Sequence, residues 1–242
     1  MLPYLDINTP FPPVSLALQQ PNGLLAAGAD LSEDRLLEAY ATGIFPWFSK
    51  GEPILWWSPN PRTVFLLNKF NPSKSLCRFV RQAELSVTLN TAFEQVVQRC
   101  SEPRKDQPST WITDDIKQAY LNLHRTGNAH SVEVWKNEAL VGGIYGVSIG
   151  KLFCGESMFS GITNGSKVAL SCLIGYLREQ GFPIIDCQVE NPHLSRLGAV
   201  SIDRESYLRT IKIALSQQVD TDYWRNQTLN PRSLITRRAG LK

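Results

Sequence analysis

The pattern of apolar and polar residues predicts both strands and helices along this chain. Residues 130–135 alternate with a period of two, which is typical of a half-buried strand. Residues 31–43, 90–100 and 164–181 instead place apolar side chains on one helical face, and Asn90 is expected to cap the second of these helices. Several strands, followed by a strand–helix–strand–helix order, indicate an α/β (α+β) fold with a mixed sheet.

The chain is expected to divide into three parts. Residues 1–62 are rich in proline, glycine and aromatic side chains around one helix that Ser32 begins, and they predict a small N-terminal domain. Residues 63–220 hold the predicted mixed sheet, and residues 221–242 form a basic C-terminal tail. A length of 242 residues is enough for one large domain together with a small one.

Two short apolar strands carry isolated polar side chains. In the predicted strand 184–188, a period of two places Asp186 and Gln188 on the same face. In the predicted strand 153–160, Glu156 lies among apolar residues. A buried carboxylate is costly without a partner. The two acids therefore indicate either satisfied buried polar groups or a pocket for a ligand that is both apolar and cationic.

The net charge of +3 is distributed unevenly. Residues 221–242 carry a net +4, so the rest of the chain is close to neutral. Nucleic-acid binding would therefore depend on local patches. The segment 53–83 is one candidate, although a solvated basic face is the alternative; its cations are Arg62, Lys69, Lys74, Arg78 and Arg81.

Cysteine usage and motifs exclude several classes of chemistry. The five cysteines form no CxxC pair, which indicates reduced, mostly buried thiols in a cytoplasmic protein, and nothing predicts a metal site. Residues 161–167 lack P-loop spacing, and Phe159 replaces the second glycine of a nucleophile elbow. No apolar run reaches the roughly 20 residues of a membrane span, and no signal peptide is evident. With these classes of chemistry excluded, the sequence favours a pocket that positions two substrates for reaction.

Bulges or close backbone approaches are expected at Gly142, Gly143 and Gly146.

Nine sequence motifs follow one another between residues 20 and 210: GLLAAGADLSEDRLLEAYATGIFPWFS, ILWWSPNPR, TWIT, AHSVEVW, LVGGIYG, FCGESMFS, SKVAL, IIDCQ and RLGA. In these motifs and their order, the chain resembles the leucyl/phenylalanyl-tRNA–protein transferases. The resemblance implies transfer of Leu or Phe, and less readily Met, from leucyl-tRNA or phenylalanyl-tRNA to the N-terminal Arg or Lys of proteins, which marks them for N-degron degradation. It further implies a small N-terminal domain, a larger acetyltransferase-like domain, and no metal or coenzyme A. The departures are Asn60, Gly161 and Gly165, where Asp, Arg and Ala are usual.

The resemblance also implies roles for individual residues. Glu156 is expected to hold the donor's ammonium group, and Trp47 and Trp111 are expected to stack on the terminal adenine. Met158 suits a pocket for both branched and aromatic guests, because its thioether adapts its shape. The remaining predicted substrate-binding residues, several of which would serve equally as ordinary core, are Tyr40, Tyr120, Ile144, Phe153, Gly155, Leu170, Leu173 and Ile185.

The implied reaction is the aminolysis of an ester. The acceptor's α-amino group has a reference pKa of about 7.7–8.0, so a mild base is enough near pH 7. Asp186 is expected either to be that base or to anchor the acceptor's basic side chain, and Gln188 to align the amine or to steady the oxyanion. The rival classes are a coenzyme A acetyltransferase and a non-catalytic tRNA-binding protein. A monomer is expected.

Overall fold

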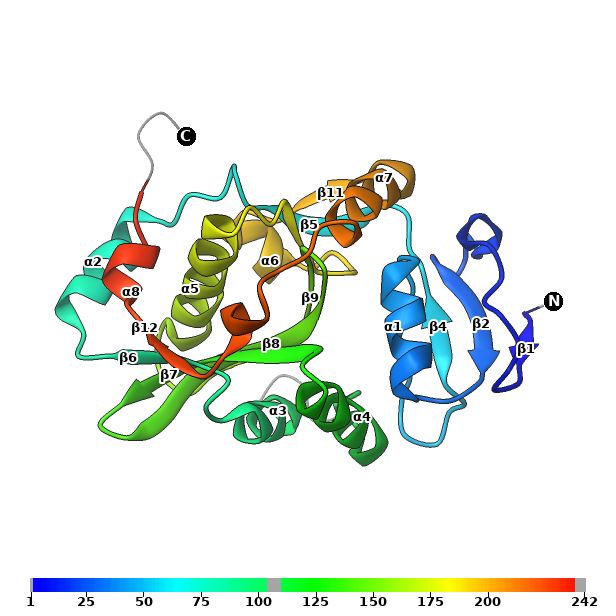
Figure 1. Ribbon diagram of the computed structural model, residues 1–242, viewed down its shortest axis with the longest axis horizontal. Coiled ribbons are helices and arrows are strands. Elements are labelled where there is room, and N and C mark those ends of the chain that lie inside the picture. Colours follow the sequence, from blue (N-terminus) through cyan, green and yellow to red (C-terminus); the bar gives the residue numbers. More distant parts are fainter. Residues whose placement is uncertain (1, 104–109, 238–242) are drawn as a thin grey trace.

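The computed structural model describes residues 2–103 and 110–237, and it contains a small sheet and a large sheet (Figure 1). In the small sheet, the strands follow the order β1-β2-β4-β3. Helix α1 (Glu33–Ala41) lies between this sheet and the rest of the molecule (Figure 1). The strands of the small sheet are β1 (Tyr4–Leu5), β2 (Leu24–Gly28), β3 (Phe45–Pro46) and β4 (Leu55–Trp57), and a short 3₁₀ helix, η1, covers Val14–Leu16.

The large sheet has the strand order β11-β5-β10-β9-β8-β7-β6-β12. Strand β10 runs parallel to β9 and antiparallel to β5, so the sheet is mixed and the predicted α/β class is confirmed. Helix α5 (Gly165–Glu179) connects the two parallel strands. The strands are β5 (Arg62–Leu66), β6 (Ser86–Leu89), β7 (Ala129–Lys136), β8 (Ala139–Ile149), β9 (Leu152–Ser160), β10 (Ile184–Asp186), β11 (Val200–Ile202) and β12 (Gln227–Leu229).

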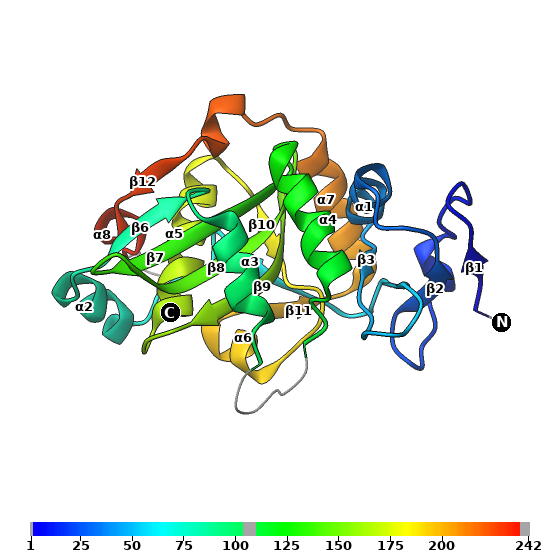
Figure 2. The ribbon, with the colours of Figure 1, turned by 90° about the horizontal axis from the view of Figure 1, so that it is seen from below.

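The helices cover both faces of the large sheet, and a hydrophobic core lies on each face (Figures 1 and 2). One core lies under α5 with α2 (Lys74–Gln82) and α8 (Pro231–Leu234). The other core contains α3 (Phe93–Ser101), α4 (Asp114–Arg125) and α7 (Arg204–Leu215), and it continues into the small sheet because α1 contacts both α4 and α7. The remaining helices are α6 (Pro192–Leu197) and the 3₁₀ helix η2 (Thr221–Trp224). No helix in the described part of the chain is long and apolar enough to cross a membrane.

The expected helix cap at Asn90 is wrong. Helix α3 begins at Phe93, and Ala92 takes the N-cap position. Asn90 instead has a φ of 58°, and its side chain accepts a hydrogen bond from the backbone N of Ser131 at 2.9 Å. Its amide also donates to His130 Nδ1 at 3.0 Å and to the Trp224 carbonyl at 2.6 Å. The side chain therefore joins β7 to the C-terminal segment instead of capping a helix.

Residues 221–237 of the basic C-terminal segment fold onto the large domain. Strand β12 pairs with β6 in antiparallel register. The Trp224 ring stacks on His130 with centroids 3.8 Å apart, and Tyr223 stacks on Tyr176 at 4.2 Å. Helix α8 packs on α5 so closely that a Cβ on Gly175 would lie 2.6 Å from the Leu234 carbonyl oxygen. These contacts fix the segment against the sheet.

Candidate functional site

Asp186 is the last residue of β10, and it forms a buried ion pair with Arg62, the first residue of β5. Arg62 Nε donates to Asp186 Oδ1 at 2.8 Å, and Nη2 donates to Oδ2 at 2.7 Å. The Tyr207 hydroxyl donates to Oδ2 at 2.9 Å. Asp186 is 0% exposed and Arg62 is 1% exposed. Burial alone would lower the pKa of Arg62, but the Asp186 carboxylate outweighs burial and raises this pKa above its ordinary value.

The surroundings of Arg62 complete its burial. Its guanidinium lies over the rings of Phe45 and Tyr207, 4.8 Å and 4.7 Å from their centroids, and Nη1 donates to the Gly43 carbonyl at 3.1 Å. The expectation that Arg62 contacts tRNA phosphates is therefore wrong, because its charge is neutralised inside the protein. The geometry equally fails to support Asp186 as a base or an anchor in direct contact with the acceptor, since both of its oxygens are engaged and enclosed.

The expected strand 184–188 ends early, and this changes how Gln188 is presented. The backbone N of Gln188 donates to Asp186 Oδ1 at 3.0 Å, and Gln188 has a φ of 55°, in the left-handed region. An aspartate that accepts from the amide two residues on favours a turn over a continued strand. Asp186 and Gln188 therefore do not lie side by side on one strand face. Instead, Asp186 fixes the backbone from which Gln188 extends.

Glu156 is a half-buried carboxyl group held by two tyrosines and by Gln188. Tyr40 Oη lies 2.8 Å from Glu156 Oε1, and Tyr120 Oη lies 2.7 Å from Oε2. Gln188 Nε2 donates to Oε1 at 3.3 Å. Asp186 and Glu156 thus contact the same glutamine, one through its backbone and the other through its side chain.

A β-bulge directs the Glu156 side chain towards the tyrosines. In the β8–β9 ladder, Tyr145 pairs with Ser157 and Gly146 pairs with Gly155, so Glu156 is the extra residue between them. Such a bulge reverses the alternation of faces along the strand. The bulge at Gly146 confirms one of the expectations for the glycine positions; a Cβ there would lie 2.1 Å from the Cys154 carbonyl oxygen.

The environment of Glu156 favours its protonated form. Burial raises its pKa to about 7, and the hydroxyls of Tyr120 and Tyr40 oppose this shift only in part. The two tyrosine oxygens also lie 2.5 Å apart, so three oxygen–oxygen contacts connect three groups. Two hydroxyl protons can satisfy only two of these contacts, whereas a proton on Glu156 supplies the third. The site therefore gains or loses a proton close to neutral pH.

The predicted apolar pocket residues lie together in one core cluster beside the bulge. Phe153 and Ile185 are paired across β9 and β10, and both are buried. Met158 is partly exposed at the edge of the cluster. Gly155 lies beside Ile185, whose Cγ2 would be 3.5 Å from an added Cβ. The other predicted pocket residues in the cluster are Ile144, Leu170 and Leu173.

The two tryptophans expected to stack on adenine lie near the boundary between the small sheet and α4. Trp47 is 43% exposed, with its ring centroid 5.6 Å from that of Trp57. Trp111 is half-buried just before α4. The pKa of Asp114, at the start of α4, is lowered mainly by Lys117 and further by Lys50, which follows Trp47 in the chain.

Profiles of known families match the chain in two adjacent regions. The leucyl/phenylalanyl-tRNA protein transferase N-terminal domain matches residues 29–60, and the leucyl/phenylalanyl-tRNA protein transferase domain matches residues 64–212. The chain belongs to this family. The resemblance noted in the sequence is thereby confirmed, and the protein is an aminoacyltransferase whose family name implies tRNA and protein substrates.

Curated members of the family are similar over nearly the whole chain. A leucyl/phenylalanyl-tRNA–protein transferase of Xanthomonas campestris is 55% identical over 87% of this chain and 86% of its own length. One from Shewanella pealeana is 52% identical over 89% and 91%, and one from Pseudoalteromonas atlantica is 50% identical over 91% and 94%. Among solved structures, a Staphylococcus epidermidis protein of unknown function is 12% identical over 74% of this chain and 68% of its own, with a TM-score of 0.39, too remote to support an argument.

The family match covers the polar residues around Glu156 and Asp186 but ends before the C-terminal segment. Tyr40 lies in the first matched region, and Tyr120, Glu156, Asp186 and Gln188 lie in the second. Two of the three departures from the family pattern, Asn60 and Gly165, make close local contacts. Asn60 Oδ1 accepts from the backbone N of Arg204 at 3.0 Å, and Gly165 begins α5 where a Cβ would lie 2.4 Å from the Val141 carbonyl oxygen.

Sequence patterns did not predict the two partners of Asp186, which are Arg62 and Tyr207. Arg62 could not be recognised as a partner because 124 residues separate it from Asp186 in the sequence. The cations of the predicted phosphate surface other than Arg62 are exposed, namely Lys69, Lys74, Arg78 and Arg81. Arg232 and Arg237 join that surface from the C-terminal segment. No group of three or more His, Cys, Asp or Glu residues that could hold a metal ion occurs within residues 2–103 and 110–237.

Proposed function

We propose that the protein transfers Leu or Phe, and less readily Met, from the corresponding aminoacyl-tRNA to the N-terminal Arg or Lys of proteins, in the cytoplasm, as a step of N-degron degradation. The observation that carries this proposal is the position of Glu156. Glu156 lies three residues along β9 from Phe153, which pairs with Ile185 in the apolar cluster, and burial raises the pKa of its carboxyl group to about 7. A site with one titratable acid and an apolar neighbour suits an aminoacyl group, which offers an ammonium and an apolar side chain.

The donor would bind through three contacts. Ionised Glu156 holds the α-ammonium group, which supplies protons to the oxygens that Tyr40 and Tyr120 contact. The apolar cluster takes the Leu or Phe side chain, with the partly exposed Met158 at its edge. Trp47 and Trp111 stack on the terminal adenine, a contact worth roughly 1–3 kcal/mol per base.

Gln188 would align the acceptor amine. Gln188 Nε2 donates to Glu156. The amide oxygen of Gln188 therefore remains free to accept a hydrogen bond from an N–H of the acceptor amine. The amine attacks the ester carbonyl in its neutral form, a C–N bond forms, the C–O bond to the ribose breaks, and the departing ribose oxygen takes the amine proton. Asp186 supports this step as a positioning residue, because it fixes the backbone of Gln188 while Arg62 fixes its own carboxylate.

One assay tests the proposal against both rival classes. The protein is incubated with phenylalanyl-tRNA or leucyl-tRNA and a peptide that begins with Arg, with a matched peptide that begins with Glu as control. The mass of the peptide that begins with Arg is expected to increase by one Leu or Phe residue, and the mass of the control peptide is expected to stay unchanged. Acetyl transfer from coenzyme A to the same peptide would favour an acetyltransferase, and tRNA binding without any transfer would favour a non-catalytic protein.

A further inference from the structure

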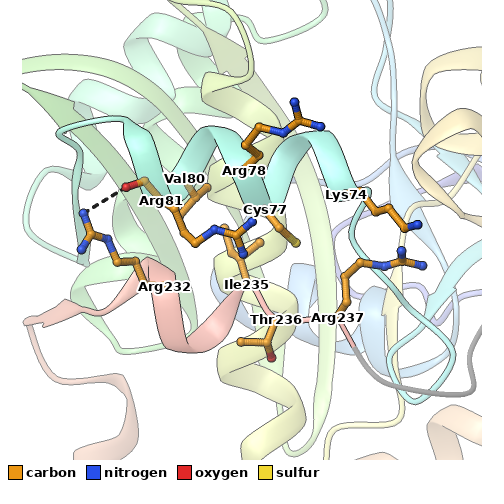
Figure 3. A pocket seen from close by; sticks show the side chains of 9 residues that line it. All are labelled: Lys74, Cys77, Arg78, Val80, Arg81, Arg232, Ile235, Thr236 and Arg237. Carbon is orange, nitrogen blue, oxygen red and sulfur yellow. Dashed lines mark hydrogen bonds between the residues drawn. The ribbon is translucent and has the colours of Figure 1, made fainter.

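A groove of about 800 Å³ between α2 and the C-terminal segment is lined by cations from both sides (Figure 3). Helix α2 contributes Lys74, Arg78 and Arg81, while Arg232 and Arg237 come from α8 and the residues after it. Cys77, Val80, Ile235 and Thr236 complete the lining, so no acidic residue takes part.

The two sides of the groove are held in fixed positions. On α2, Leu76, Cys77 and Val80 are buried, and the cations occupy the exposed positions between them. Arg232 Nη2 donates to the Arg81 carbonyl at 3.2 Å, close to the C-terminus of α2, and the backbone N of Arg232 is capped by Asn230 Oδ1 at 3.0 Å. The packing of α8 on α2 and α5 holds the second side in place.

The charges of the groove are not balanced from within the protein. Among the described residues, none of its five cations forms an ion pair with a carboxylate. Lys74 and Arg237 lie at one end of the groove, and Arg81 and Arg232 lie towards the other (Figure 3). Like charges that line one groove repel each other, and an anion between them would relieve the repulsion.

We propose that this groove binds the phosphate backbone of tRNA, with Arg232 and Arg237 forming its second side. The inference rests on the proposed function, because that function supplies an RNA substrate. Arg guanidinium groups match phosphate oxygens in bidentate geometry, and a groove with cations along both sides follows a ribose–phosphate strand better than it fits a flat lipid surface. The C-terminal segment lies outside residues 64–212 that match the family model, so the family match alone does not point to Arg232 and Arg237.

The test measures the affinity for deacylated tRNA as a function of salt concentration. The double variant Arg232→Gln/Arg237→Gln is compared with Lys136→Gln/Lys212→Gln, which removes two exposed cations elsewhere. Each lost phosphate contact lowers the slope of log K against log[salt] by about 0.9 for a duplex backbone. The groove variant is expected to lose between one and two units of slope and roughly tenfold in affinity near 0.1 M salt, and the control variant is expected to keep both.

A second variant separates binding from folding. Arg237→Gln removes a groove cation for which no hydrogen bond to the rest of the fold is described, so it should lose about one unit of slope with an unchanged unfolding curve. An unchanged slope in both groove variants overturns the inference, as does an equal loss in the control variant. The inference is also overturned if the groove variants lose binding to anionic lipid vesicles while they keep the wild-type affinity for tRNA. A wild-type protein that shows this salt response but never transfers an amino acid would refute the proposed function and leave the groove assignment standing.

Discussion

Arg62 holds both carboxylate oxygens of Asp186, although 124 residues separate the two in the sequence. The pair joins the first strand of the large sheet to β10, and Tyr207 attaches α7 to the same carboxylate. Removing one partner of a buried ion pair leaves the other charge without compensation, which commonly costs about 3–5 kcal/mol. Asp186 therefore stabilises the fold next to Glu156 and Gln188, because it connects β5, β10 and α7.

Asp186→Asn should destabilise the protein by about 3 kcal/mol, because the Arg62 charge would remain buried beside a neutral amide. The measurement is the free energy of unfolding by urea. Glu156→Gln is the matched carboxylate-to-amide control, and it should not destabilise the protein. Loss of transfer by Asp186→Asn with an unchanged free energy of unfolding would instead restore a direct catalytic role for Asp186.

The Michaelis constant for charged tRNA should rise as the pH falls through about 7, because the donor ammonium needs ionised Glu156 and the pKa of Glu156 lies at about 7. Donor binding near pH 6 should accordingly release protons, which calorimetry in buffers of different ionisation enthalpy detects. In Glu156→Gln, both the proton release and this pH dependence should vanish. Their persistence in that variant would assign them to another group.

A rise in pH that favours donor binding should lower the free energy of unfolding of the protein without substrate. A carboxyl group whose pKa is raised on folding binds more protons in the native state, so its destabilising effect grows from about pH 4.5 to pH 7. Glu156→Gln removes this effect. The variant should gain on the order of 1 kcal/mol at pH 8, after discounting for partial exposure, and nothing at pH 4. Thermal unfolding at both pH values measures the difference, and an equal gain at both would point to a packing effect.

Met158→Ala should enlarge the donor pocket at its partly exposed edge. The smaller leucyl side chain would fill the resulting space less well than the phenylalanyl side chain. The Michaelis constant should therefore rise more for leucyl-tRNA, within the range of about 1–3 kcal/mol that missing methylene contacts are worth. Steady-state kinetics with both donors measure the ratio, and an unchanged ratio would place Met158 outside the pocket.

Trp47→Ala should weaken the binding of charged tRNA by roughly 1–3 kcal/mol, because it removes one π-face for the terminal adenine. The side chain is 43% exposed, so the fold should tolerate the change. Trp47→Phe keeps an aromatic face and should recover part of the affinity. If tRNA lacking its terminal adenosine loses as much affinity with the variant as intact tRNA does, the stacking assignment is wrong.

Period and composition predicted the mixed sheet and most of its helices, because those depend on local residue patterns. They could not predict which face of β9 carries Glu156, since the bulge between Gly155 and Ser157 reverses the alternation and depends on the pairing with β8. They also extended β10 to Gln188, because the turn there is set by the Asp186 side chain. The Arg62–Asp186 pair depends on long-range topology that no single segment encodes.

The C-terminal segment also has a consequence for solubility. Strand β12 covers the backbone hydrogen-bonding groups of β6, which would otherwise form an open edge of the large sheet. Unpaired strand edges recruit strands from other molecules and lead to aggregation. A chain shortened before β12 would expose that edge together with the faces of His130 and Tyr176 that Trp224 and Tyr223 cover. Such a chain would form intermolecular sheets at concentrations where the chain that contains β12 stays dispersed.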